Sequence, residues 1–103
     1  MTQALKDIVI NALEEIKATN ITTIDVRELT GLMDTMVVAT GNSNRQVKSL
    51  ANSVVVGAKK AGHILIGVEG DDTSEWILVD FGDVIVHVML PATREFYDLE
   101  RLW

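Results

Sequence analysis

The sequence lacks cysteine, has a single proline, Pro91, and contains only 5% aromatic residues. The absence of cysteine excludes disulfides, thiolate metal sites and a cysteine nucleophile, and it is typical of a cytosolic protein. Basic residues are also scarce, because 9 lysines and arginines stand against 15 acidic residues, for a net charge of −6. Binding to a nucleic-acid backbone requires clustered cations, so we do not expect direct nucleic-acid binding as the main mode of action. A basic protein is the better-matched partner.

Long apolar runs are missing as well. No stretch approaches the length of a membrane-spanning helix, so we expect no membrane partner. The first residues match neither a secretory signal nor an acid-poor transit peptide, since Asp7, Glu14 and Glu15 come early. No repeat, low-complexity tract or linker divides the sequence. We therefore expect one domain over residues 1–103 and a cytoplasmic location.

Hydrophobic periodicity divides the sequence into helices and strands. Apolar residues recur at helical spacing over 3–19 and again after Ser43. At the start of this second helix Ser43 and Gln46 match a capping box, and at its end Gly62 can take a left-handed cap. Strands are predicted at 22–27, 35–40 and 64–69 and in a hairpin over 75–90, with a short helix from Pro91. This order predicts an α/β domain with a mixed sheet of about five strands and helices mainly on one face. The strand–helix–strand unit over 35–69 should form a right-handed parallel crossover.

The hairpin over 75–90 is the most informative segment. Its strands meet at a tight turn, Phe81–Asp83, and strand side chains alternate between the two faces of a sheet. One face is purely aliphatic and suits a core under helices: Ile77, Val79, Val84, Val86 and Val88. The other combines aliphatic with aromatic, carboxylate, imidazole and thioether groups: Trp76, Leu78, Asp80, Ile85, His87 and Met89. A docking surface and a face covered by a second layer of the same domain are equally good interpretations of this pattern.

Three features have both a chemical and a structural interpretation. Gly41–Ser43 opens a helix and offers amides to a phosphate, but it matches neither the dinucleotide fingerprint nor the P-loop, so a plain capped helix is favoured. Asp80 and Asp83 are conceivable metal carboxylates for nucleotidyl transfer, yet turn formation explains both. For His87 a structural or interface role is favoured over catalysis, because no serine or cysteine nucleophile lies near it in the sequence.

The C-terminal segment is rich in apolar and aromatic residues. Phe96 and Leu99 are spaced to pack onto the sheet, and Tyr97 would then point away from them toward a partner. Closure of the core edge by all the aromatic side chains is the alternative, and the sequence leaves both open.

A family resemblance is carried by segments along the whole chain, in this order: Asp34, Val37–Val47, Gly67–Gly70, Trp76, Asp80–Val88 and Phe96–Trp103. In combination they closely resemble the ribosomal silencing factor family, RsfS, also called Iojap-like. One departure is Leu65, where members commonly carry a proline shortly before the Gly-Val-Glu-Gly segment. The difference affects the stiffness of a loop and has little bearing on function.

The resemblance implies a fold similar to nucleotidyltransferases without their catalytic carboxylates. It therefore implies a protein that is not an enzyme, and we expect no cofactor and no metal. Family members bind the large ribosomal subunit through ribosomal protein L-fourteen, on the face that meets the small subunit. They sterically block subunit joining and repress translation when nutrients run low, whereas organelle relatives act in ribosome assembly. Members often form homodimers when free.

The predicted docking surface combines the pattern of the hairpin with this resemblance. Its apolar centre is expected to be Trp76, Leu78, Ile85, His87 and Met89, flanked by Asp80 and Tyr97, with Asp98 and Glu100 as rim carboxylates for basic ribosomal side chains. The same face is a candidate for the dimer contact, so that dimerisation and ribosome binding would compete. Two alternatives stay open: a large-subunit assembly factor with the same docking site, and a nucleotidyltransferase-like enzyme.

Overall fold

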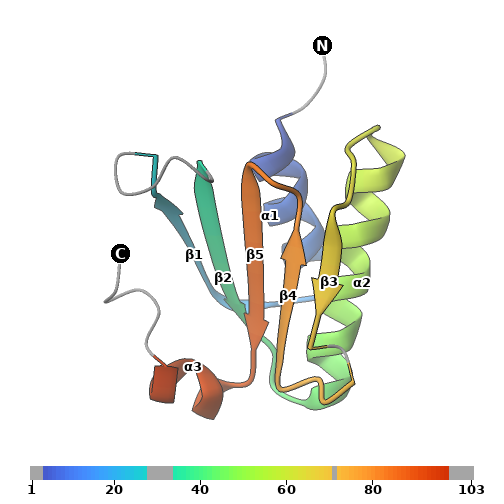
Figure 1. The fold of residues 1–103 in the computed structure, drawn as a ribbon. Coiled ribbons are helices and arrows are strands. Elements are labelled where there is room, and N and C mark those ends of the chain that lie inside the picture. Colours follow the sequence, from blue (N-terminus) through green and yellow to red (C-terminus); the bar gives the residue numbers. More distant parts are fainter. Residues whose placement is uncertain (1–3, 28–33, 71, 98–103) are drawn as a thin grey trace.

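The computed structural model describes residues 4–27, 34–70 and 72–97. This part of the chain forms three helices and five strands (Figure 1). In chain order they are α1 (Leu5–Glu15), β1 (Thr19–Asp25), β2 (Thr35–Thr40), α2 (Asn44–Lys60), β3 (Gly67–Glu69), β4 (Trp76–Asp80), β5 (Val84–Met89) and α3 (Pro91–Tyr97). None of the helices in these ranges is long and apolar enough to cross a membrane.

The strands form one mixed sheet of five strands, as the sequence predicted, and the structure gives their order as β1-β2-β5-β4-β3 (Figure 1). β2 and β5 are parallel, and the other neighbouring strands are antiparallel. The crossover through α2 connects β2 to β3, which runs in the same direction as β2. These two strands are not neighbours, because the β4–β5 hairpin lies between them in the sheet.

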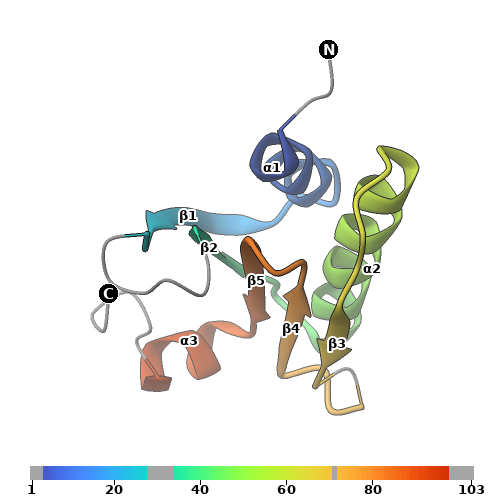
Figure 2. The ribbon, with the colours of Figure 1, turned by 45° about the horizontal axis from the view of Figure 1, so that its top comes forward.

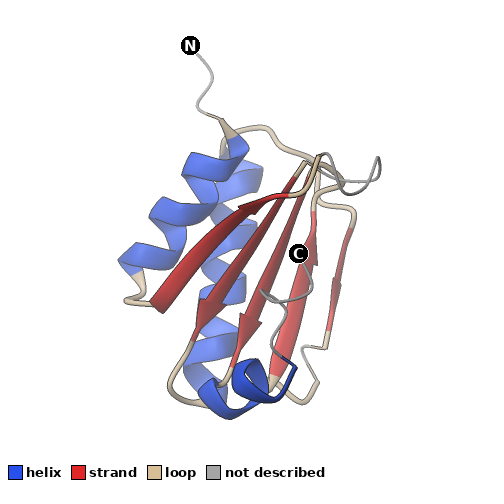
Figure 3. Ribbon diagram, turned by 90° about the vertical axis from the view of Figure 1, so that its left-hand side faces the viewer, coloured by secondary structure: helices blue, strands red, loops and turns tan. Residues whose placement is uncertain are grey.

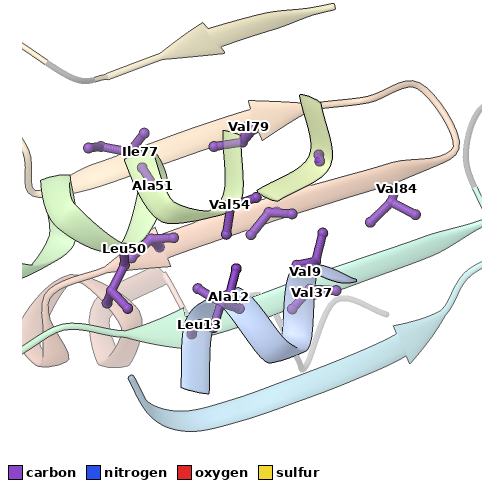
Figure 4. Packing of buried hydrophobic residues seen from close by; sticks show 14 of the residues in the cluster. Val9, Ala12, Leu13, Val37, Leu50, Ala51, Val54, Ile77, Val79 and Val84 are labelled. Carbon is purple, nitrogen blue, oxygen red and sulfur yellow. The ribbon is translucent and has the colours of Figure 1, made fainter. Parts of the chain in front are cut away.

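The sheet separates two unequal layers. α1 and α2 lie together on one face, and the short α3 lies on the other side (Figures 2 and 3). The main core fills the space between the two long helices and the sheet (Figure 4), and all five aliphatic residues predicted for the inner face of the hairpin belong to it. β2 is central and buried from Met36 to Thr40, which confirms its predicted position. The arrangement leaves the second face of β4 and β5 without a covering long helix.

The N-terminus of α2 is capped much as predicted. The Ser43 hydroxyl accepts a hydrogen bond from the Gln46 amide at 3.1 Å. The reciprocal bond differs from a standard capping box, since Gln46 Oε1 accepts from the amide of Asn42 at 2.6 Å instead of that of Ser43. The Gln46 Nε2 group also donates to the carbonyls of Ile16 and Lys17. One carboxamide therefore joins the end of α1 to the start of α2.

The C-terminus of α2 closes with the predicted glycine. Gly62 has a φ of 89°, and its amide donates to the Lys59 carbonyl. The next amide, that of His63, donates to the Ala58 carbonyl. This pair of bonds is a Schellman motif, which satisfies carbonyls that the helix leaves without partners.

Several predicted boundaries were wrong. The first helix is shorter than 3–19, because the chain already turns at Lys17, which has a φ of 63°. The first strand starts at Thr19 instead of Thr22, since a bulge at Asn20 lets the earlier residues pair with β2. The third predicted strand pairs only over Gly67–Glu69 and not over 64–69.

Candidate docking surface

The hairpin brings the predicted surface residues together on one face. In the β4–β5 register Trp76 pairs with Met89, Leu78 with His87, and Asp80 with Ile85. These six side chains therefore form three adjacent cross-strand rows on the side opposite the main core. α3 adds Tyr97 to this group. Asp98 and Glu100, the predicted rim carboxylates, lie outside the described residues.

The six hairpin residues differ in accessibility. Trp76, Leu78, Asp80 and Ile85 are half-buried and available to a partner. His87 is buried, and Met89 has no exposed surface. Met89 instead belongs to a small second cluster with three other buried residues, Val26, Met36 and Val38, and Trp76 packs against this cluster. Met89 therefore supports the surface from beneath.

Trp76 is fixed by contacts on both sides. Its indole Nε1 donates a hydrogen bond to His87 Nδ1 at 3.0 Å, and the two rings lie 5.9 Å apart. Burial lowers the pKa of His87 from 6.5 to about 4, so the imidazole is neutral near pH 7 and its Nδ1 is an acceptor. This bond satisfies the indole N–H without water and holds the ring in one orientation. His87 therefore orients Trp76, which agrees with the structural or interface role favoured from the sequence.

α3 extends the aromatic surface beyond the sheet. The Tyr97 ring lies 4.7 Å from that of Trp76, and the Phe96 ring lies 5.1 Å from that of Tyr97 at 75°. The four rings form a continuous array that runs outward from the buried His87 to Phe96, which is 81% exposed. The prediction that Phe96 packs onto the sheet was wrong, because α3 is rotated so that Tyr97 meets Trp76 instead.

Exposed carboxylates lie on α3, on β3 and at the two ends of the hairpin that carries this surface. Glu69 pairs with Leu78 across the β3–β4 ladder and is exposed, as are Glu75, Asp83 and Glu95. Sequence reasoning missed Glu69, although its place opposite a surface residue follows once the short strand is paired with β4. The apolar centre with an acidic rim is complementary to a basic protein surface.

The residues considered for nucleotide chemistry have local structural roles. Asp80 Oδ1 accepts a hydrogen bond from the Gly82 amide at 2.8 Å, which is the turn contact expected of an aspartate at this place. In the loop before α2, the Gly41 amide donates to the Met89 carbonyl and the Asn42 amide to Gln46. Two of the amides proposed for a phosphate are thus already bonded within the protein. Within the described ranges, no group of three His, Cys, Asp or Glu side chains is arranged to hold a metal ion.

Comparison with known proteins identifies the family. The family model described as "Ribosomal silencing factor during starvation" matches residues 1–103. The chain belongs to the ribosomal silencing factor family. A Chromobacterium violaceum protein named ribosomal silencing factor RsfS is 55% identical over 101 residues, which cover 98% of this chain and 83% of that protein. The family is one of ribosome-directed regulatory proteins and not one of enzymes.

A solved structure and a mitochondrial protein also match this chain. A crystal structure of a Chromobacterium violaceum protein superposes with a TM-score of 0.96 at 54% identity, covering 100% of this chain and 86% of that one. A mouse protein named "Mitochondrial assembly of ribosomal large subunit protein 1" is 33% identical over 103 aligned positions, covering 94% of this chain and 44% of that protein. The predicted fold class is confirmed by these matches and by the mixed five-stranded sheet.

Proposed function

We propose that this ribosomal silencing factor represses translation in the cytoplasm by docking on the large ribosomal subunit through ribosomal protein L-fourteen. The bound protein sterically blocks joining of the small subunit, especially when nutrients are limiting. Steric occlusion requires binding alone, so no bond is made or broken in this mechanism.

The observation that carries the proposal is the Trp76 surface. An indole held by His87 and Tyr97 loses little rotamer freedom on binding, and it is half-buried at the centre of an apolar group with an acidic rim. Fixed aromatic residues at the centre of a patch are the usual source of affinity in protein interfaces. The carboxylates around them should raise the association rate with a basic ribosomal protein and make it salt-dependent.

The test is sedimentation of the purified protein with isolated large subunits, followed by addition of small subunits. We expect co-migration with the large subunit and loss of joined ribosomes. Trp76→Ala should weaken binding by about 2 kcal/mol or more, roughly 30-fold. Trp76→Phe keeps an aromatic ring but loses the hydrogen bond to His87, so its affinity for the large subunit should lie between those of the wild type and Trp76→Ala. The control is Val56→Ala, at a 44% exposed position of α2 on the opposite layer.

Two results would contradict this assignment. A Trp76→Ala protein that folds normally and binds within twofold of the wild type would remove Trp76 from the contact. Binding of the wild type without loss of subunit joining would remove the steric mechanism and leave the docking site intact.

A second candidate function is assembly of the large subunit through the same docking site, which the name of the mouse relative favours. The two functions differ in timing. Cells that lack an assembly factor should accumulate immature large subunits even in rich medium, whereas cells that lack only a silencing factor should not. Subunit profiles of growing cells separate these outcomes.

Homodimerisation is part of the same proposal. If two free copies associate through the Trp76 surface, large subunits should dissociate the dimer, and Trp76→Ala should weaken both contacts. A dimer that stays intact on the subunit would show that the two surfaces are separate. The remaining alternative, a nucleotidyltransferase-like enzyme, predicts a thermal shift with nucleoside triphosphate and magnesium.

A further inference from the structure

α3 is separated from the two long helices of the domain by the sheet (Figures 2 and 3). None of the residues Pro91–Tyr97 is buried, so within this range the helix makes no core contact through a fully buried side chain. It follows β5 directly and lies on the side of the sheet opposite α1 and α2 (Figures 2 and 3). A short helix of this kind is unstable by itself and requires specific tertiary anchors.

Arg94 supplies such an anchor. Its Nη1 donates to the Asn20 carbonyl and, at 2.8 Å, to the Thr40 hydroxyl, and its Nη2 donates to the Thr22 hydroxyl at 2.9 Å. The acceptors lie on two different strands, β1 and β2. Because the guanidinium is planar, bonds from two of its nitrogens to separate strands fix both the position and the direction of the side chain.

The anchor determines where the aromatic residues of α3 lie. Tyr97 is one helical turn beyond Arg94 and meets the Trp76 ring, whereas the neighbouring Phe96 projects almost fully into solvent. A phenyl ring exposed to this extent contributes nothing to the core of the domain. It is, however, continuous through Tyr97 with the Trp76 surface.

We propose that α3 is a tethered arm of the docking surface, in which Phe96 contacts the basic ribosomal protein and Arg94 is the positioning residue. The inference rests on the proposed function and extends its contact beyond the sheet. Glu95, exposed on the same helix, gives the arm the acidic rim seen around the hairpin. For the arm, a basic protein is better matched in charge to Glu95 than a second copy of this chain, whose net charge is −6, while the sheet residues around Trp76 stay available to a dimer.

The first experiment measures affinity for isolated large subunits by sedimentation. Phe96→Ala should weaken binding about tenfold while the thermal midpoint stays unchanged, because the side chain is exposed. Arg94→Gln should weaken binding about fivefold, and Arg94→Lys should do the same, since an ammonium keeps the charge but not the planar fork. The double variant Arg94→Gln/Phe96→Ala should also lose only about tenfold in affinity, like Phe96→Ala alone, because both changes remove the same contact. Val56→Ala again serves as the control.

The second experiment uses the free protein. Amide hydrogen exchange across α3 should become faster in Arg94→Gln, while the amides of β5 keep their protection. Unchanged exchange in α3 would overturn the positioning role of Arg94, whatever the ribosome assay gives. Failure of the wild type to bind large subunits would overturn the proposed function and the contact of Phe96. The exchange result would still show whether Arg94 holds α3 in place.

Two further outcomes would overturn the contact of Phe96. The first is binding of Phe96→Ala within twofold of the wild type. The second is loss of self-association in Phe96→Ala with unchanged ribosome binding, which would assign the exposed ring to a second copy of the chain. Multiplicative effects of Arg94→Gln and Phe96→Ala would show that Arg94 acts independently of the arm.

Discussion

Protonation of His87 should destabilise the folded protein, because the imidazole is buried and its Nδ1 accepts the bond from Trp76. The pKa of His87 is lowered from 6.5 to about 4 by burial. The unfolded chain therefore takes up a proton near pH 6.5, whereas the folded protein stays neutral until about pH 4. The stability that depends on neutral His87 is fully present above pH 6.5 and is lost as the pH falls toward 4.

The magnitude follows from the two pKa values. One pKa unit corresponds to 1.36 kcal/mol, so the shift from 6.5 to about 4 amounts to about 3 kcal/mol at its acidic limit. At pH 5 the loss relative to pH 8 is about 2 kcal/mol. For a domain of this size, that is a large fraction of a typical total stability of about 5–15 kcal/mol.

The assay is urea unfolding of the wild type and of His87→Gln at several values between pH 8 and pH 5. Glutamine retains a hydrogen-bond acceptor but does not titrate. The loss of stability caused by the His87→Gln substitution itself does not depend on pH, so it cancels when only the pH dependence of the two proteins is compared. The contributions of the other titratable groups cancel in the same way, because both proteins contain them. The free energies of unfolding of the two proteins should converge by about 2 kcal/mol on acidification. Parallel curves over this range would refute the argument and show that His87 titrates normally in the folded state.

Two pairs of substitutions test the structure with matched controls. Gly70→Ala should cost about 1–3 kcal/mol or more, because a Cβ there would lie 2.0 Å from the Trp76 carbonyl oxygen at a φ of 87°, whereas Gly67→Ala meets nothing within 4 Å and should be nearly neutral. Val54→Ala should cost about 2–3 kcal/mol in urea unfolding because the side chain is fully buried, whereas Val56→Ala on the exposed side of the same helix should cost less than about 0.5 kcal/mol. Equal effects within either pair would contradict the packing described above.

The elements predicted best are those whose signals are local. In the hairpin the alternation of aliphatic and mixed residues is enough to assign both faces, and Asp80 with Gly82 marks the turn. In α2 the apolar stripe agrees with a cap at each end, at Ser43 and Gly62. Where periodicity, capping and turn chemistry agree, the sequence is sufficient to locate an element and its buried face.

The elements predicted less well depend on contacts between distant segments. The early start of β1 requires a positive φ at Asn20. Asparagine tolerates this conformation, but an asparagine in a sequence does not by itself predict it. Phe96 is exposed, and its helix is bonded through Arg94 to strands more than 50 residues away in the sequence. Helical spacing alone gives α3 an apolar side, but it does not say which side faces the sheet.

The docking surface and the core depend on the same strand register. In β4 and β5 every second residue packs under the helices, and the residues between them form the aromatic and acidic surface. A slip of one residue would exchange the two sets, burying Asp80 and His87 in the core and exposing valines. The hydrogen bond from the Gly82 amide to the Asp80 carboxylate helps to fix the turn and hence this register. In the docking that we propose, Asp80 therefore has two roles, through its charge beside the apolar residues and through the alignment of the strands that carry Trp76 and His87.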